Sequence, residues 1–100
     1  MGEIVSPVST PTLVTVTVRY FAGAKAAAGT TCEALDVPTD GATVAGVLAV
    51  VVASHGGPDG PLAAVLAASS YLLDGLAVHS PDEPVPHGAA LDVLPPFAGG

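Results

Sequence analysis

The pattern of apolar and polar positions divides the chain into strand-like and helix-like stretches. Residues 13–21 place apolar side chains at every second position, and residues 32–37 alternate in the same way until Pro38. Strict alternation is typical of β-strands that bury one face, so both stretches are predicted strands. The Ala-rich residues 22–28 between them predict one or two helical turns that end at Gly29.

A helical period follows and is the strongest signal in the chain. Thr43 is a good N-cap, and Gly56 with Gly57 supplies a C-terminal stop. Between them, apolar side chains recur at the i, i+3, i+4 and i+7 positions, namely Val44, Val47, Leu48 and Val51. The opposite face of this helix is predicted to carry small apolar groups that water tolerates, namely Ala45, Ala49, Val50 and Ala53.

Shorter elements fill the second half of the chain. Pro61 favours the first position of a short helix, and residues 71–73 and 76–78 flank an Asp-Gly pair that predicts a two-residue hairpin. Residues 90–93 alternate in a last strand. This order predicts an α+β domain in which one mixed sheet wraps the main helix. The first and last strands are expected to pair in its middle, projecting the C-terminus from the sheet's edge.

Composition narrows the class of protein. Residues 1–12 are rich in Ser, Thr and Pro, which predicts a disordered tail before a single domain at residues 13–100. Nine acidic and two basic residues give a formal net charge of −7, which disfavours nucleic acid and anionic membranes as partners. We expect a soluble, cytoplasmic protein: no signal peptide opens the chain, the longest apolar run is short of the ~20 residues of a membrane span, and one cysteine favours a reducing compartment.

Side chains alone offer little chemistry. His55, His79 and His87 lack metal-ligand spacing, so no metal site is predicted. Cys32 has no recognisable activating neighbour and is expected to be a small, partly buried thiol. The Asp82-Glu83 pair between prolines is interpreted as a solvated turn.

The C-terminal tail is the better candidate. Residues 94–100 read Leu-Pro-Pro-Phe-Ala-Gly-Gly, in which the prolines favour an extended path and the glycines have no Cβ to obstruct a reactant. A carboxylate on such a tail suits a narrow active site in another protein. Attachment of AMP to the carboxylate oxygen makes that oxygen part of a good leaving group. A sulfur nucleophile can then displace AMP to leave a thiocarboxylate. These steps need no catalytic side chain on the carrier.

Three stretches together resemble the small subunit of molybdopterin synthase: residues 16–22, the helix start at Thr43-Val44, and residues 91–100. The resemblance spans residues 13–100 and implies a ubiquitin-like β-grasp fold. It also implies that an E1-like adenylyltransferase uses ATP to activate Gly100 and that a sulfur donor protein provides the sulfur. The tail then enters the large subunit of molybdopterin synthase and gives sulfur to cyclic pyranopterin monophosphate. No permanently bound cofactor is implied.

The resemblance assigns roles within the tail. Gly100 bears the sulfur, Gly99 clears the channel, and Pro95 with Pro96 keeps the tail extended. The remaining tail residues are expected to contact the partner, namely Leu94, Phe97 and Ala98. Three departures leave the docking details open: a lysine at position 25 where many members have arginine, alanines in place of an acidic pair before the last strand, and a leucine in place of an aromatic at position 94.

Other functions share these features. Relatives with the same fold and Gly-Gly end carry sulfur for thiazole or cysteine biosynthesis, and the Pro-Pro pair and chain length favour the molybdopterin branch over them. A ubiquitin-like modifier, joined through its C-terminus to lysines, is a second class. A binding module whose glycines are incidental is a third.

Overall fold

The computed structural model describes residues 12–96. Its strands and helices in chain order are β1 (Leu13–Tyr20), α1 (Gly23–Ala28), β2 (Cys32–Pro38), α2 (Val44–Ser54), α3 (Pro61–Ala68), β3 (Ser70–Leu73), β4 (Leu76–Ala77) and β5 (Ala90–Leu94), with short 3-10 helices at Thr39–Gly41 and Gly57–Asp59. The predicted elements are therefore confirmed, with bounds that differ by one or two residues. Of the predicted N-terminal tail, residues 1–11 lie outside the described residues.

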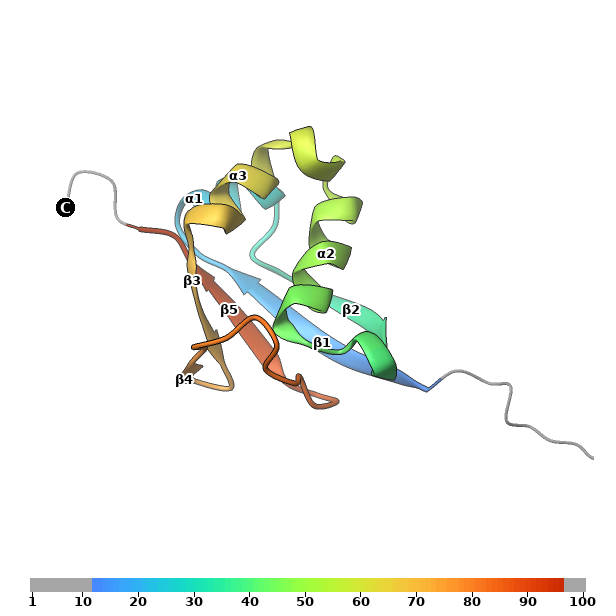
Figure 1. Ribbon diagram of the computed structural model, residues 1–100. Helices are drawn as coiled ribbons and strands as arrows, with labels where there is room; N and C mark the ends of the chain where they lie inside the picture. The colour runs from blue at the N-terminus through green and yellow to red at the C-terminus, as the bar shows by residue number, and fades with distance from the viewer. Residues whose placement is uncertain (1–11, 97–100) are drawn as a thin grey trace, which may run out of the picture.

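One five-stranded sheet organises the domain, in the order β2-β1-β5-β3-β4. β1 and β5 run parallel in its middle, while β2 and β3 flank them in antiparallel fashion (Figure 1). The predicted central pairing of the first and last strands is therefore confirmed. Because parallel neighbours need a long crossover, the helices between β1 and β5 in sequence form that connection and cover one face of the sheet.

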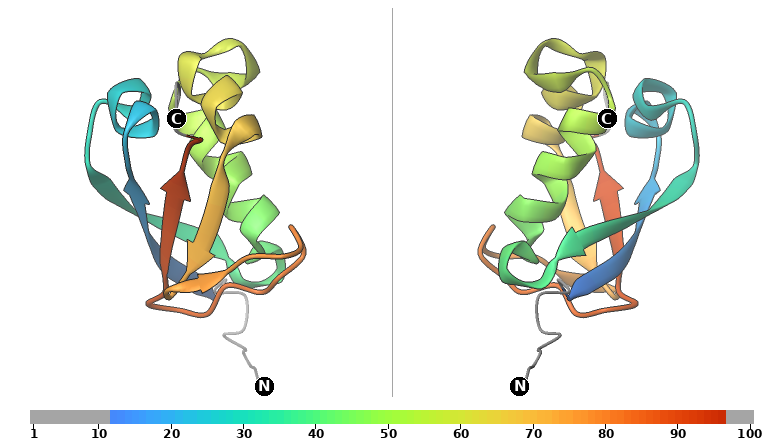
Figure 2. Two further views of the ribbon diagram at one scale, coloured as in Figure 1. Left: turned by 90° about the vertical axis from the view of Figure 1, so that its left-hand side faces the viewer. Right: turned by 90° about the vertical axis from the view of Figure 1, so that its right-hand side faces the viewer.

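The core lies between this inner face of the sheet and α2 (Figure 2). Alternation along β1 and β5 turns every second side chain toward the helix, and α2 meets them with a stripe of valines. The largest buried side chains are Tyr20, Leu62, Leu91, Val16, Val18, Val37, Val44, Val47, Val51 and Val93. Leu48 was predicted on this stripe but is only half-buried, because it lies at the edge of the helix that faces an open apolar groove toward α3.

Local signals in the sequence act as expected. The Oγ1 atom of Thr43 accepts a hydrogen bond from the Gly46 backbone N–H at 3.0 Å, which caps α2. Gly56 follows α2 in the left-handed region, with φ of 97°. Asp74 and Gly75 have φ of 49° and 84°, the combination that a two-residue hairpin with right-handed strand twist requires. No helix within residues 12–96 is both long and apolar enough to cross a membrane.

Candidate functional site

The candidate site is the root of the tail, where β5 ends. β5 pairs with β1 from Thr17↔Ala90 to Tyr20↔Val93, and with β3 as far as Ser70↔Leu94. Its inward side chains, Leu91 and Val93, are completely buried. The strand that leads to the tail is thus held by hydrogen bonds on both sides and by the core beneath it, so the root has a fixed position and direction.

The chain leaves the sheet beside an apolar notch. Leu94 and Pro95 are half-buried and Pro96 is exposed. Leu94 and Pro95 line a notch of about 390 Å³ together with Phe21 and Ala22, which follow β1. Of the predicted tail, the structure therefore describes Leu94, Pro95 and Pro96. The other predicted site residues, Phe97, Ala98, Gly99 and Gly100, lie outside the described residues.

An ion pair crosses the two central strands on the outer face, opposite α2. Arg19 of β1 stands beside Asp92 of β5 in register, and its Nε donates to Oδ1 at 2.5 Å while Nη2 donates to Oδ2 at 2.8 Å. Asp92 is the one buried charged residue in the described part of the chain. The hydrogen bond and the negative charge of Asp92 raise the pKa of Arg19. The alternation of each strand placed both residues on an outer face, but only the parallel register makes them neighbours.

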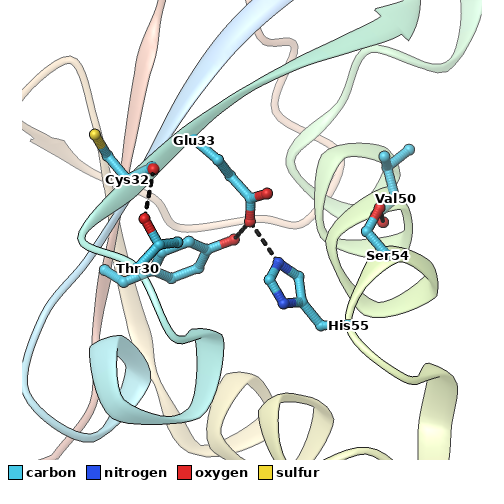
Figure 3. Close-up of polar contacts among 7 residues, drawn as sticks. Thr30, Cys32, Glu33, Val50, Ser54 and His55 are labelled. Carbon is cyan, nitrogen blue, oxygen red and sulfur yellow. Dashed lines mark hydrogen bonds and ion pairs between the residues drawn. The ribbon is translucent and has the colours of Figure 1, made fainter.

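A second polar cluster lies on the inner face. The Oε2 atom of Glu33, on β2, accepts a hydrogen bond from the buried Tyr20 hydroxyl at 2.5 Å and lies 2.5 Å from Nε2 of His55. His55 follows the last residue of α2. Figure 3 shows Glu33 and His55 pointing toward each other from β2 and from the end of α2. The cluster therefore ties β1, β2 and the end of the helix together.

The electrostatics of this cluster favour a structural role. Burial on its own raises the pKa of Glu33, but the hydrogen bonds from Tyr20 and His55 outweigh it and lower that pKa. Burial, then the hydrogen bond to Glu33, raises the pKa of Tyr20. Glu33 thus stays ionised and Tyr20 stays protonated, so neither is suited to exchange protons near neutrality. The sequence does contain one indication of this cluster: Glu33 lies on the same strand face as the apolar Leu35 and Val37. A charged side chain on an apolar face needs polar partners.

Cys32 corrects one prediction. It was expected to be partly buried, but it is exposed, because β2 is an edge strand and its outer face has no covering element. In Figure 3 its sulfur points away from Glu33. His87 has a structural role, because its Nδ1 accepts a hydrogen bond from the Thr15 backbone N–H at 3.0 Å. Residues 12–96 contain no group of three or more His, Cys, Asp and Glu side chains that could hold a metal ion.

Comparison with known proteins fits this geometry. The sequence pattern of the ThiS family matches residues 18–100, which include β2 to β5 and the last three residues of β1. The chain belongs to the ThiS family. This ThiS-family chain is 25% identical to SAMP1 from Haloferax volcanii, with a TM-score of 0.72 over 86% of this chain and 99% of that one. No curated protein matches the chain.

Two further structures resemble this ThiS-family protein. The putative molybdopterin converting factor subunit 1 from Pyrococcus furiosus is 25% identical, with a TM-score of 0.67 over 84% of this chain and 99% of that one. A chain in the complex of subunits 1 and 2 of the molybdopterin-converting factor from Helicobacter pylori is 18% identical, with a TM-score of 0.62 over 87% and 100%, and shows the fold alone. The protein is therefore a member of a family of ubiquitin-like sulfur carriers with a β-grasp fold.

Proposed function

We propose that this protein carries sulfur as a thiocarboxylate on Gly100 and donates it during molybdenum cofactor biosynthesis. The observation that carries the proposal is the root of the tail: the central strand β5 runs directly into Pro95 and Pro96, and the family match extends through Gly100. The similarity to the putative molybdopterin converting factor subunit from P. furiosus supports this branch. Tail and body have separate tasks, since the body docks and the tail reacts.

The proposed chemistry takes place at the Gly100 carbonyl carbon. A carboxylate oxygen of Gly100 attacks the α-phosphorus of ATP, and pyrophosphate leaves, which gives an acyl adenylate. Hydrosulfide released by the donor protein then attacks the carbonyl carbon, so that the C–S bond forms as the C–O bond to AMP breaks. AMP leaves with the electron pair, the S–H proton passes to solvent, and the thiocarboxylate remains on Gly100. ATP is bound and used by the activating enzyme, so this chain needs no resident cofactor.

The proposed partners are an E1-like adenylyltransferase, a sulfur donor protein and the large subunit of molybdopterin synthase. Beyond Leu94, the six residues to Gly100 can extend about 20 Å from the sheet at ~3.3–3.6 Å per residue. That reach is sufficient to enter a partner's active site while the folded body stays outside. Leu94 and Phe97 are proposed to make apolar contacts there, and Gly99 to pass the narrowest part of the channel.

Intact-mass analysis tests the proposal. After incubation with ATP, the activating enzyme and a sulfur donor, the chain should gain the mass of one oxygen-to-sulfur exchange, and fragmentation should place the sulfur on Gly100. A Cys32→Ser variant should gain the same mass. A variant with one extra, trimming-resistant residue after Gly100 should gain none. Sulfur found on Cys32, or on the extended variant, would refute the proposal.

A second candidate function shares the adenylate. SAMP1 structures are described as those of a small archaeal modifier protein, and the similarity to them favours a modifier role as the alternative. In that case the Gly100 carbonyl joins a lysine amine of a target protein, and denaturation-resistant conjugates appear in extracts. Loss of molybdopterin, with thiazole still made, in an extract that lacks this chain would instead assign the carrier role to the molybdopterin branch.

A further inference from the structure

On the described strands, the outer face of the sheet carries one positive charge. The helices cover the opposite face (Figure 2), so the outer side chains of β1, β2, β3 and β5 face away from them. The sequence has only two basic residues, and Arg19 is the one that lies on the sheet, while Lys25 lies on α1. In a chain of net charge −7, a cation near the end of β1 is a local exception to the overall potential.

The geometry of the ion pair presents the cation and hides the anion. The Arg19 side chain is 49% exposed, whereas that of Asp92 is 8% exposed. Asp92 occupies Nε and Nη2, and within residues 12–96 the Nη1 atom has no hydrogen-bond partner. A guanidinium carries five N–H donors, so Arg19 retains donors that Asp92 does not use on a side chain that is half exposed. Asp92 fixes the plane of the guanidinium in advance, which reduces the entropy lost when Arg19 binds a partner.

Arg19 has the exposed Cys32 as its neighbour on β2, and apolar side chains lie on the other side and toward the tail. Leu72 of β3 pairs with Asp92 in register, and Leu94 follows Asp92 on the same face of β5. Phe21 follows Arg19 by two positions and is 42% exposed. Phe21 and Leu94 also line the apolar notch at the root of the tail. The cation and the notch therefore form one continuous surface beside the point where the tail leaves the sheet.

We propose that Arg19 is a docking and specificity residue, which binds a carboxylate of the enzyme that activates the tail while an apolar side chain of that enzyme fills the Phe21–Leu94 notch. Asp92 is the positioning residue for Arg19. The inference rests on the proposed function. The group on the enzyme that contacts Arg19 is expected to be acidic, because every other charge on the described strands is negative. A carboxylate of the enzyme is then attracted at Arg19 and repelled beside the other charges. A misaligned partner therefore places its carboxylate against like charge.

The test is ATP–pyrophosphate exchange catalysed by the E1-like adenylyltransferase encoded in the same genome, with this chain as the varied substrate. The main variant is Arg19→Leu/Asp92→Leu, which removes the cation without leaving Asp92 unpaired, so the fold is retained. Thr15→Val/Asp36→Leu is the matched control, because it removes a polar pair that joins β1 and β2 on the same face at the end of β1 away from the tail. A charge-swapped variant, Arg19→Asp/Asp92→Arg, keeps an ion pair across the strands but inverts the sign presented by β1. Circular dichroism checks the fold of each variant.

Loss of a docking contact should raise KM without changing kcat, because the contact stabilises the enzyme–substrate complex and the transition state equally. We expect KM to rise about tenfold in the double-leucine and charge-swapped variants and less than about twofold in Thr15→Val/Asp36→Leu, with kcat unchanged throughout. A folded charge-swapped variant with the wild-type KM, or a double-leucine variant with the KM of Thr15→Val/Asp36→Leu, overturns the docking role. A wild-type chain that supports no exchange overturns the proposed function and this inference with it.

Discussion

Replacing Glu33 with alanine tests the inner-face cluster most directly. Glu33 accepts hydrogen bonds from Tyr20 and His55, each at 2.5 Å. A hydrogen bond to a charged acceptor contributes about 1.5–3 kcal/mol, and a buried donor that loses its acceptor adds its own desolvation cost. The Tyr20 hydroxyl is such a donor, but the Glu33 side chain is 25% exposed, so water can replace part of what is lost. We therefore expect Glu33→Ala to reduce the free energy of unfolding by about 2–3 kcal/mol.

Urea denaturation followed by circular dichroism measures this loss, and thermal melting should show a fall of roughly 10–20 °C. Asp36→Ala is the matched control on the same strand, because Asp36 accepts one hydrogen bond, from the Thr15 hydroxyl at 2.8 Å, at an exposed position. It should cost less than about 1 kcal/mol. Equal losses in the two variants would refute the assignment of Glu33 as a clamp between β1, β2 and α2.

The same comparison has a predicted pH dependence. The pKa of Glu33 is lower in the folded chain than its ordinary value of 4.5, so the unfolded chain takes up the proton first on acidification. The contribution of Glu33 is therefore complete above about pH 5 and declines as the pH falls through the folded pKa. The difference in unfolding free energy between wild type and Glu33→Ala should be largest at pH 7 and should narrow toward pH 3. A difference that stays constant would contradict the ionised state of Glu33.

Two other predictions concern tyrosine ionisation and helix packing. Burial raises the pKa of Tyr71 to about 12, and burial raises the pKa of Tyr20 as well. An absorbance titration should therefore show no phenolate in the folded protein near pH 10. A tyrosine that titrates normally at that pH would refute the burial of both rings. Stability should fall as the pH rises above 10, because only the unfolded tyrosines then lose protons. Gly46→Ala gains about 1 kcal/mol of helix propensity, but its Cβ would overlap the Gly41 carbonyl oxygen. Urea denaturation should therefore show a net loss of about 1–2 kcal/mol in the free energy of unfolding. Gly23→Ala is the control, because its Cβ enters open space and the free energy of unfolding should not fall.

Local signals were sufficient for most of the fold. The Thr43 cap, the Asp74-Gly75 turn and the alternation of residues 13–20 each act over a few residues, so the sequence displays them directly. The parallel pairing of β1 with β5 was also predictable, because the long helical connection between an early and a late strand leaves few alternative topologies. The tail was recognisable as a candidate site from its sequence, although its last four residues lie outside the described part of the chain.

Contacts between distant residues were not predictable. His55 and Glu33 are 22 residues apart, and Arg19 and Asp92 are 73 apart, so neither pair has a local pattern. Their contacts depend on the length of the connections and on the exact register of the strands, in which a shift of one residue moves a side chain to the other face. The exposure of Cys32 has the same origin, because the sequence of β2 does not reveal that its outer face stays uncovered.

Along β1 and β2, residues that stabilise the fold from the inner face alternate with residues on the outer face, where docking is proposed. Arg19 and Cys32 are paired on the outer face, and one residue further along each strand Tyr20 and Glu33 point to the inner face. A substitution at position 20 or 33 therefore acts on the contact between sheet and helix, while one at position 19 acts on the surface next to the tail. Because the β5 strand is held on both sides, loss of an outer-face contact should leave the direction of the tail unchanged. Under the docking role proposed above, partner specificity can therefore change through outer-face residues without loss of the fold that holds the root of the tail.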